Sequence, residues 1–253
     1  MSLPCFGARQ QRQIARLQAF ERATLRCVIV VIGALGLRGT IDEPAADGLA
    51  PEIAIWAAAA GARVELISKA GDDPAGDAVL IALAQAGVGH VATLRDPARL
   101  TPVRSLPAEP TDPADPAVDA GPVTPTEALA DELTAPGPDE NATPHPPPVL
   151  DAADIALALR YLTDFEVLVA VHPTPDLLAE AVAAAAWAGA RLVVVVEPEA
   201  DVPAGVPSDA LVVSAAADDA EGVGERIGRY AAALSRGDDP ASAYGELTAV
   251  PAT

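Results

Sequence analysis

The stretch that decides the fold is Val64-Glu-Leu-Ile-Ser-Lys-Ala-Gly-Asp-Asp-Pro-Ala-Gly-Asp-Ala-Val-Leu-Ile-Ala-Leu-Ala-Gln-Ala-Gly-Val-Gly-His90. Its apolar beginning, Val64 to Ile67, predicts a short buried strand. Asp73 is placed to accept from backbone N–H groups at the start of a helix, and Pro74 suits the first helical position. Apolar residues then recur on one helical face, and Gly87 is expected to end the helix. The stretch therefore predicts a strand, a tight acidic turn and a helix.

This pattern resembles the N-terminal signature of the ribokinase-like, or phosphofructokinase-B (PfkB), family of carbohydrate kinases. In that family an alanine-rich helix leads to a strand, Gly-x-Asp-x-x-Gly follows the strand, and the next helix ends in Gly-Val. The corresponding residues here are Ile53 to Ala62, then Gly71, Asp73 and Gly76, then Gly87-Val88. The resemblance implies an α/β fold, a three-layer α/β/α sandwich around a mostly parallel sheet. We interpret Gly71, Asp73 and Gly76 as architectural, and no metal site is predicted at this acidic turn.

The composition limits what the chain is expected to bind. Its 253 residues are enough for one α/β domain, with 51% hydrophobic residues and only 3% aromatic ones. A net charge of −20 disfavours binding to nucleic acid and to anionic membranes. The longest apolar runs are too short to cross a bilayer. We therefore expect a cytoplasmic protein without nucleic-acid or membrane partners, in which Cys5 and Cys27 are reduced.

The chain divides into an N-terminal helix and one interrupted domain. Residues 1–26 are expected to form an amphipathic helix, either solvated or docked on its own domain or on a second copy. Residues 27–253 are the expected ribokinase-like domain, interrupted by a Pro-rich acidic loop at 97–148. That segment holds fourteen of the chain's 25 prolines and nine acidic residues, which disfavours helix and central strand. An interdomain linker and a remnant of structured sequence both fit this composition.

Outside that segment, strand-like and helix-like patterns alternate, as in an α/β sandwich with right-handed parallel crossovers. The expected elements before it, besides the stretch quoted above, are the strand Cys27 to Ile32 and a helix from Asp47 or Gly48 to about Ala60. Those after it are the helix Ile155 to Leu162, the strand Glu166 to Val171, the helix Pro175 to Trp187, the strand Arg191 to Glu197, the strand Leu211 to Ser214, the helix Gly222 to Leu234 and a short helix capped by Asp239.

The substrate contacts of the family are only partly matched. Family members carry an aspartate after the first strand, whereas Leu35 to Arg38 stand there in this chain. The glycines from Gly33 to Gly39 are spaced GxxGxxG, which does not favour a dinucleotide site. Asp47 and Glu52, near the start of the alanine-rich helix, would accept from ligand hydroxyls, or else they are acidic residues favourable in a first helical turn. His172 ends a predicted strand, where α/β ligand sites occur.

The catalytic motif is the main departure. Gly228 to Gly237 resembles the second half of the helix that follows the family's Asp-Thr-Thr-Gly-Ala-Gly-Asp signature. In that signature backbone N–H groups hold the transferring phosphate, and the aspartate takes the proton from the sugar hydroxyl. Counting back without gaps makes Gly222 and Gly224 remnants of the anion loop, with Gly224 in the place of the aspartate. If the alignment is shifted by one residue, Glu225 takes the place of the aspartate. If the segment Gly228 to Gly237 instead corresponds to an earlier part of the family fold, the motif is missing altogether.

These departures identify the chain as a degenerate member of the family. We expect lost or strongly reduced phosphorylation and a residual ligand-binding or regulatory role toward a small sugar or nucleoside. The alternatives are an active, divergent ATP-dependent sugar or nucleoside kinase using ATP and Mg²⁺, and a structural subunit of an oligomer such as a homodimer.

The Pro-rich segment gives a first prediction. Limited proteolysis of the full chain should cut first between Pro97 and Pro148, and the two fragments should stay associated in a folded domain, because prolines and charges disfavour packing there. Mass spectrometry of the first fragments, with circular dichroism of the nicked protein, checks this. Cooperative unfolding on the first cut would show that the segment is packed structure.

Overall fold

The computed structural model describes residues 28–104, 146–215 and 220–248. The expected helix at 1–26 and residues 105–145 of the Pro-rich segment lie outside these ranges. The strands are β1 (Val28–Ile32), β2 (Gly36–Gly39), β3 (Pro44–Asp47), β4 (Arg63–Gly71), β5 (Thr93–Asp96), β6 (Val103–Arg104), β7 (Val167–Val171), β8 (Arg191–Val196) and β9 (Leu211–Ser214). The helices are α2 (Leu49–Ala59), α3 (Pro74–Gln85), α4 (Ala152–Leu159), α5 (Pro175–Ala188), α6 (Ala220–Ser235) and α7 (Pro240–Thr248).

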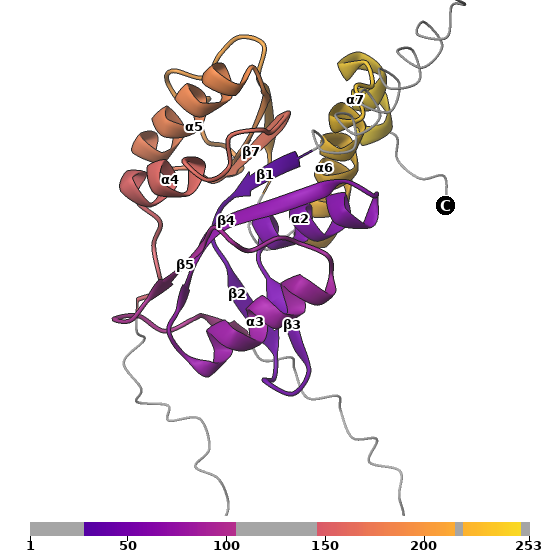
Figure 1. The fold of residues 1–253 in the computed structure, drawn as a ribbon. Helices are drawn as coiled ribbons and strands as arrows, with labels where there is room; N and C mark the ends of the chain where they lie inside the picture. The colour runs from indigo at the N-terminus through magenta and orange to yellow at the C-terminus, as the bar shows by residue number, and fades with distance from the viewer. Residues whose placement is uncertain (1–27, 105–145, 216–219, 249–253) are drawn as a thin grey trace, which may run out of the picture.

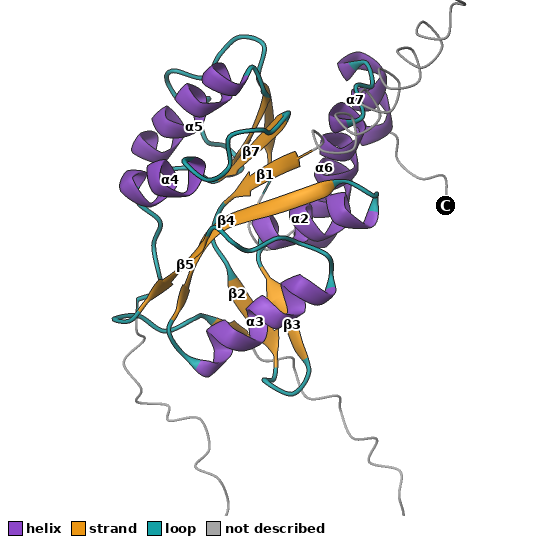
Figure 2. Ribbon diagram, in the orientation of Figure 1, coloured by secondary structure: helices purple, strands orange, loops and turns teal. Residues whose placement is uncertain are grey.

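Six strands form a parallel sheet in the order β5-β4-β1-β7-β8-β9. Helices α4 and α5 cover one face of this sheet, and α2, α6 and α7 lie on the other (Figure 1). A second, three-stranded sheet in the order β3-β2-β6 lies beside α3 (Figure 2). The expected three-layer α/β/α sandwich with a mostly parallel sheet is therefore present.

The alternation of side chains along β1 separates the two halves of the core. Ile29 and Val31 join the cluster built with α2, α3 and α6, whereas Val30 and Ile32 join the cluster built with α4 and α5. All four side chains are buried, as expected for a central strand of a parallel sheet that is covered on both faces. The run of β-branched residues therefore supplies both interfaces from one strand.

Most of the elements expected from the sequence are confirmed, and β4 is longer than expected. It spans nine residues because its first half pairs with β1 and its second half pairs with β5, from Ser68 to Gly71. Asp151 and Asp154 form a capping box at the start of α4, which runs from Ala152 to Leu159 and not from Ile155 to Leu162 as expected. The structure also adds the short strands β2, β3, β5 and β6, which the sequence analysis did not include.

The beginning of the Pro-rich segment belongs to the domain. Thr101 is buried, and Val103 and Arg104 form β6, which pairs with Leu37 and Arg38 of β2. The packed domain therefore extends beyond Pro97 at least to Arg104, while a loop over the remainder stays a prediction.

Helix α6 packs closely on α2 through glycines. A Cβ atom at Gly228 would lie 2.7 Å from the Ile53 carbonyl oxygen and 2.8 Å from the Trp56 Cβ, and one at Gly224 would lie 2.8 Å from the Glu52 Cβ. Since real Cβ atoms do not approach this closely, only glycine allows the two helices this separation. Arg229 also lies over the Trp56 ring, 5.7 Å from its centroid.

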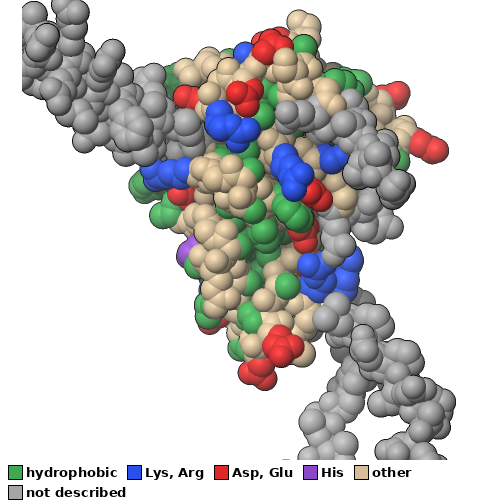
Figure 3. Space-filling view, turned by 90° about the vertical axis from the view of Figure 1, so that its right-hand side faces the viewer, with side chains coloured by type: hydrophobic (Ala, Val, Ile, Leu, Met, Phe, Trp, Pro, Cys, Tyr) green, Lys and Arg blue, Asp and Glu red, His purple; other side chains and the backbone are tan. Residues whose placement is uncertain are grey.

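The face that contains this helix pair is not uniformly polar. Figure 3 looks onto the right-hand side of Figure 1 and shows hydrophobic side chains in a band down the middle of the face, with basic and acidic side chains beside this band and across the upper part of the face. No helix in the described ranges is long and apolar enough to cross a membrane.

The turn after β4 is held by one carboxylate. Asp73 Oδ1 accepts from the Gly76 amide at 2.6 Å, which caps α3, and Oδ2 accepts from the Thr101 amide at 2.6 Å. The Gly71 amide donates to the Thr101 hydroxyl at 2.9 Å, and Arg95 donates to the Gly71 carbonyl at 2.7 Å. Four segments, the ends of β4 and β5, the start of α3 and residues 99–101, therefore meet at Asp73.

The two glycines of the signature leave room for this arrangement. A Cβ at Gly71 would lie 2.6 Å from the Arg99 carbonyl oxygen and 2.7 Å from the Thr101 nitrogen. A Cβ at Gly76 would collide with the Arg95 guanidinium and the Gly71 carbonyl oxygen. These contacts are the ones that an architectural role of Gly71, Asp73 and Gly76 requires, and that role stays a prediction.

The α2–α6 contact gives a second prediction. Gly228→Ala should lower the free energy of unfolding by about 1–3 kcal/mol, because overpacking outweighs the better helix propensity of alanine. Gly222→Ala in the same helix is the matched control, since among the described residues no atom outside its own stretch of helix lies within 4 Å of its Cβ position. That control should leave stability unchanged or raise it. Urea unfolding measures both variants. Equal free energies of unfolding for Gly228→Ala and Gly222→Ala would show that α6 can move away from α2 without loss of stability.

The turn gives a third prediction. Partial burial would raise the pKa of Asp73, but hydrogen bonds from the Thr101 and Gly76 amides and the Thr101 hydroxyl, with Arg95 nearby, hold it below its usual value. Asp73→Ala should lower the free energy of unfolding by about 2 kcal/mol near neutral pH. The carboxylate stabilises the fold above its ordinary pKa, so the difference should shrink as pH falls through the lowered native pKa.

Two variants and a pH series make this measurable. Asp73→Asn keeps an acceptor and should lose less stability than Asp73→Ala, and Asp72→Ala, at an exposed neighbour, should change stability by less than about 0.5 kcal/mol. A loss that does not depend on pH would contradict a role for the charged carboxylate.

Candidate functional site

A cleft of about 390 Å³ opens at the carboxyl ends of β1 and β7. From β1 the chain continues to β4 on one side, whereas β7 lies on the other side of β1. This is the topological switch point of the sheet, where open α/β sheets bind their ligands. The cleft is therefore in the position that the topology itself favours.

The floor of the cleft depends on a close approach of backbone at Gly33. A Cβ at this residue would lie 2.6 Å from the Ala50 Cβ and 3.1 Å from the Val171 Cβ. The Gly33 amide donates to the Ile67 carbonyl at 3.2 Å, and its carbonyl accepts from the buried Ser68 hydroxyl at 2.7 Å. Glycine thus lets the start of α2 lie against the ends of β1 and β7.

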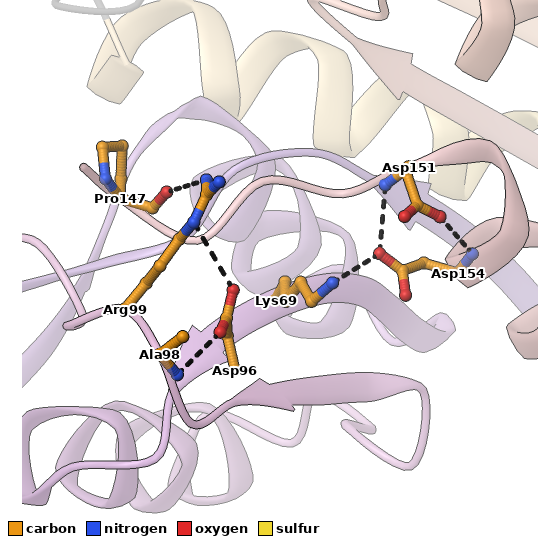
Figure 4. A network of polar contacts seen from close by, with 7 residues as sticks. All are labelled: Lys69, Asp96, Ala98, Arg99, Pro147, Asp151 and Asp154. Carbon is orange, nitrogen blue, oxygen red and sulfur yellow. Dashed lines mark hydrogen bonds and ion pairs between the residues drawn. The ribbon is translucent and has the colours of Figure 1, made fainter.

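Two charged side chains of the cleft wall are paired within the protein. Asp47 Oδ2 lies 3.4 Å from the Arg104 Nε, across the small sheet. Lys69 Nζ donates to Asp154 Oδ2 at 2.8 Å, and the Asp154 carboxylate also accepts from the Asp151 amide at 3.0 Å (Figure 4). The lysine therefore joins the end of β4 to the start of α4 at the edge of the cleft.

His172 is also paired, and its backbone is unusual. It has φ of 45°, a left-handed conformation that few residues other than glycine adopt. Its Nε2 donates to the Ala215 carbonyl at 2.8 Å, and its Nδ1 lies 3.3 Å from the Glu197 carboxylate. Because Glu197 follows β8 and Ala215 follows β9, the His172 imidazole holds the ends of β7, β8 and β9 together beside the cleft.

The rim of the cleft comes from the two ends of the Pro-rich segment. Pro102 lines it from one end, and Pro147 to Leu150 line it from the other. Arg99 joins these ends by donating to the Pro147 carbonyl at 2.9 Å, and it also pairs with Asp96 at 3.8 Å (Figure 4). Residues almost fifty positions apart therefore form one wall.

Of the two predicted substrate-binding acids, the cleft contains one. Asp47 lines it, while Glu52 lies one helical turn into α2, is 8% exposed, and pairs with Arg38 at 3.3 Å. Glu52 also faces Gly224 of α6. These contacts give Glu52 a structural role, and the binding of ligand hydroxyls by either acid stays a prediction.

The predicted anion-loop remnants lie inside α6. Gly222 is in its first turn and Gly224 starts its second turn against α2. Glu225 pairs with Arg229 one turn later at 2.8 Å and does not line the cleft. Gly224 therefore packs on α2, and the described residues that line the cleft include neither Gly222 nor Glu225.

The sequence analysis missed two features of this site. Lys69 is the only lysine in the chain and precedes the Gly-x-Asp turn, which was a usable signal. The rim contributed by Pro102 and by Pro147 to Leu150 had no such signal, because its two halves meet only through the fold.

Comparisons with known proteins were made for the whole chain. No family model and no curated protein matches it. Solved structures do match: Sa239, at 13% identity and a TM-score of 0.55, covers 86% of this chain and 90% of its own. A protein assigned as ribokinase II from E. coli, in the apo form, is 13% identical with a TM-score of 0.53, covering 85% and 89%. A protein assigned as a ribokinase from Agrobacterium tumefaciens is 15% identical with a TM-score of 0.51, covering 85% and 87%.

At these identities the likeness concerns the fold. The element order, the parallel sheet and the matches over most of each chain agree, and they agree with the resemblance found in the sequence. The chain has a ribokinase-like α/β/α fold.

Proposed function

We propose that this protein binds a small hydroxylated ligand, a sugar or a nucleoside, in the cleft between β1 and β7, and that ATP-dependent phosphorylation is lost or strongly reduced. The observation that carries the proposal is the cleft itself, a concave site at the switch point of a ribokinase-like fold. The proteins assigned as ribokinases that share this fold support a sugar-like ligand.

The side chains support the loss of phosphoryl transfer. A general base must reach the attacking hydroxyl with its carboxylate available for the proton. Among the described residues, Asp47 is the only carboxylate that lines the cleft, and Arg104 already neutralises it. Glu225, the alternative base, pairs with Arg229 on α6. Neither arrangement resembles an activated base.

ATP and Mg²⁺ belong to the alternative of an active kinase. In the described ranges no group of three or more His, Cys, Asp or Glu side chains is placed to hold a metal ion. Gly224, which would stand at the phosphate loop, packs on Glu52 and Ile53 instead. We therefore assign none of the described residues to a nucleotide–metal site.

The fourth prediction concerns turnover. With ATP and Mg²⁺, a panel of pentoses, hexoses and nucleosides should give no product above background, because loss of a general base alone typically costs about 10²–10⁴ in rate. A coupled ADP assay, run beside an active ribokinase, measures this. Glu225→Gln and Asp47→Asn should leave the background unchanged.

The other outcomes identify the alternatives. Turnover abolished by Glu225→Gln would establish the slipped alignment and an active kinase. Turnover abolished by Asp47→Asn alone would make Asp47 the base. No ligand-induced thermal shift with any sugar or nucleoside, combined with a stable oligomer by light scattering, would favour the structural subunit.

A further inference from the structure

We propose that His172 acts as a pH-dependent clamp on the ends of three strands. When its ring carries two protons, it holds the carboxyl ends of β7, β8 and β9 together, and when it loses one proton it releases one of its two contacts. This inference goes beyond the proposed function and does not depend on it, because it concerns the protein without a ligand. It rests on the kinds of atom that face the two ring nitrogens.

Both atoms that face the ring accept hydrogen bonds and cannot donate them. The Ala215 carbonyl oxygen lies 2.8 Å from Nε2, and a Glu197 carboxylate oxygen lies 3.3 Å from Nδ1. A neutral imidazole carries one N–H, so it donates to only one of these oxygens and turns a lone pair toward the other. The imidazolium carries an N–H on each nitrogen and can donate to both. The two contacts are therefore made together only by the charged ring.

The charges around the ring favour this protonated form. Among the described residues, Glu197 is the only acid within ion-pair distance of the ring. Glu199 follows the same strand and Asp176 stands in the first turn of α5, and both are exposed. β9 contributes no charged residue. The charged residues that line the cleft with His172 are already paired within the protein, Lys69 with Asp154 and Asp47 with Arg104.

The backbone around the ring supplies local reporters of the clamp. The left-handed conformation of His172 is costly and persists only where the surroundings hold it. The His172 amide donates to the Val195 carbonyl at 2.8 Å, and the Ala215 amide donates to the Val196 carbonyl at 2.9 Å. Since these bonds adjoin the ring contacts, the loss of a ring contact should be felt there first. Because His172 also lines the cleft, the clamp determines how firmly the β7 side of the cleft wall is held.

Hydrogen exchange of the full chain without ligand, between pH 5.5 and pH 8.5, tests the clamp. We expect the protection factors of the His172 and Ala215 amides, corrected for the intrinsic effect of pH on exchange, to fall by about five- to tenfold over this range. The fold stabilises the protonated ring, so that stabilisation is present at low pH and is lost as pH rises. The Ala62 amide, which donates to the Ala57 carbonyl at 3.1 Å, is the internal control and should keep its protection.

Glu197→Gln is the decisive variant, because the Glu197 side chain is half-exposed and its replacement leaves the core intact. An amide group both donates and accepts, so it can pair with Nδ1 whether or not that nitrogen carries a proton. The pH dependence at both reporter amides should disappear, while their protection at pH 8.5 stays at or above that of the unmodified chain.

Two histidine variants complete the test. His172→Asn keeps a residue that tolerates the left-handed backbone, and it should lower protection at both reporter amides at every pH. His90→Asn is the matched control, because the His90 Nδ1 has no hydrogen-bond partner among the described residues. That variant should retain the full pH dependence.

The contrary results are equally defined. Reporter protection that does not change with pH in the unmodified chain would overturn the clamp. A pH dependence that survives Glu197→Gln, or one that His90→Asn removes, would show that another group titrates and would overturn it as well. Each of these results leaves the proposed function standing, because no ligand takes part in the measurement.

Discussion

The arrangement of this domain depends on the hydrogen bonds that the Asp73 carboxylate accepts. It caps α3 through Gly76 and at the same time holds the backbone of Thr101, so one side chain fixes a helix and a segment 28 residues away. Because Thr101 is held there, Pro102 reaches the rim of the cleft and β6 pairs with β2. The small sheet and the cleft rim therefore both depend on a turn whose residues Gly71, Asp73 and Gly76 do not themselves line the cleft.

Close approach through glycine is the second constraint, and it determines where the cleft lies. Gly33 allows the start of α2 to meet the ends of β1 and β7, and Gly224 and Gly228 allow α6 to lie on α2. A side chain at any of these positions would separate layers that are now in contact. The signature glycine Gly224 thus serves helix packing here, although the family resemblance suggested an anion loop.

Two charged side chains of the cleft wall have partners of opposite charge, although the chain as a whole carries −20. Asp47 faces Arg104 and Lys69 faces Asp154, and the His172 imidazole lies beside Glu197. Paired charges in a partly buried site avoid the cost of an isolated charge and leave little net field to attract an ion. The cleft therefore offers a ligand mainly its shape and its apolar surface. This agrees with the proposal that the cleft binds a small ligand without transferring a phosphoryl group to it.

The sequence by itself determined the layers of this protein. The β-branched runs at β1, β7 and β8 and the caps Asp73 and Asp151 act over a few residues, so local pattern was enough to predict these strands and helices. The ribokinase-like fold was expected from the resemblance of the stretch Val64 to His90 to a family signature. It did not determine the short strands β2, β3, β5 and β6, whose four or fewer residues are stabilised by partners distant in the chain. The cleft was decided only by tertiary structure: Gly33, Lys69, Pro102 and His172 come from separate segments, and only the crossing of the chain at the switch point brings them together.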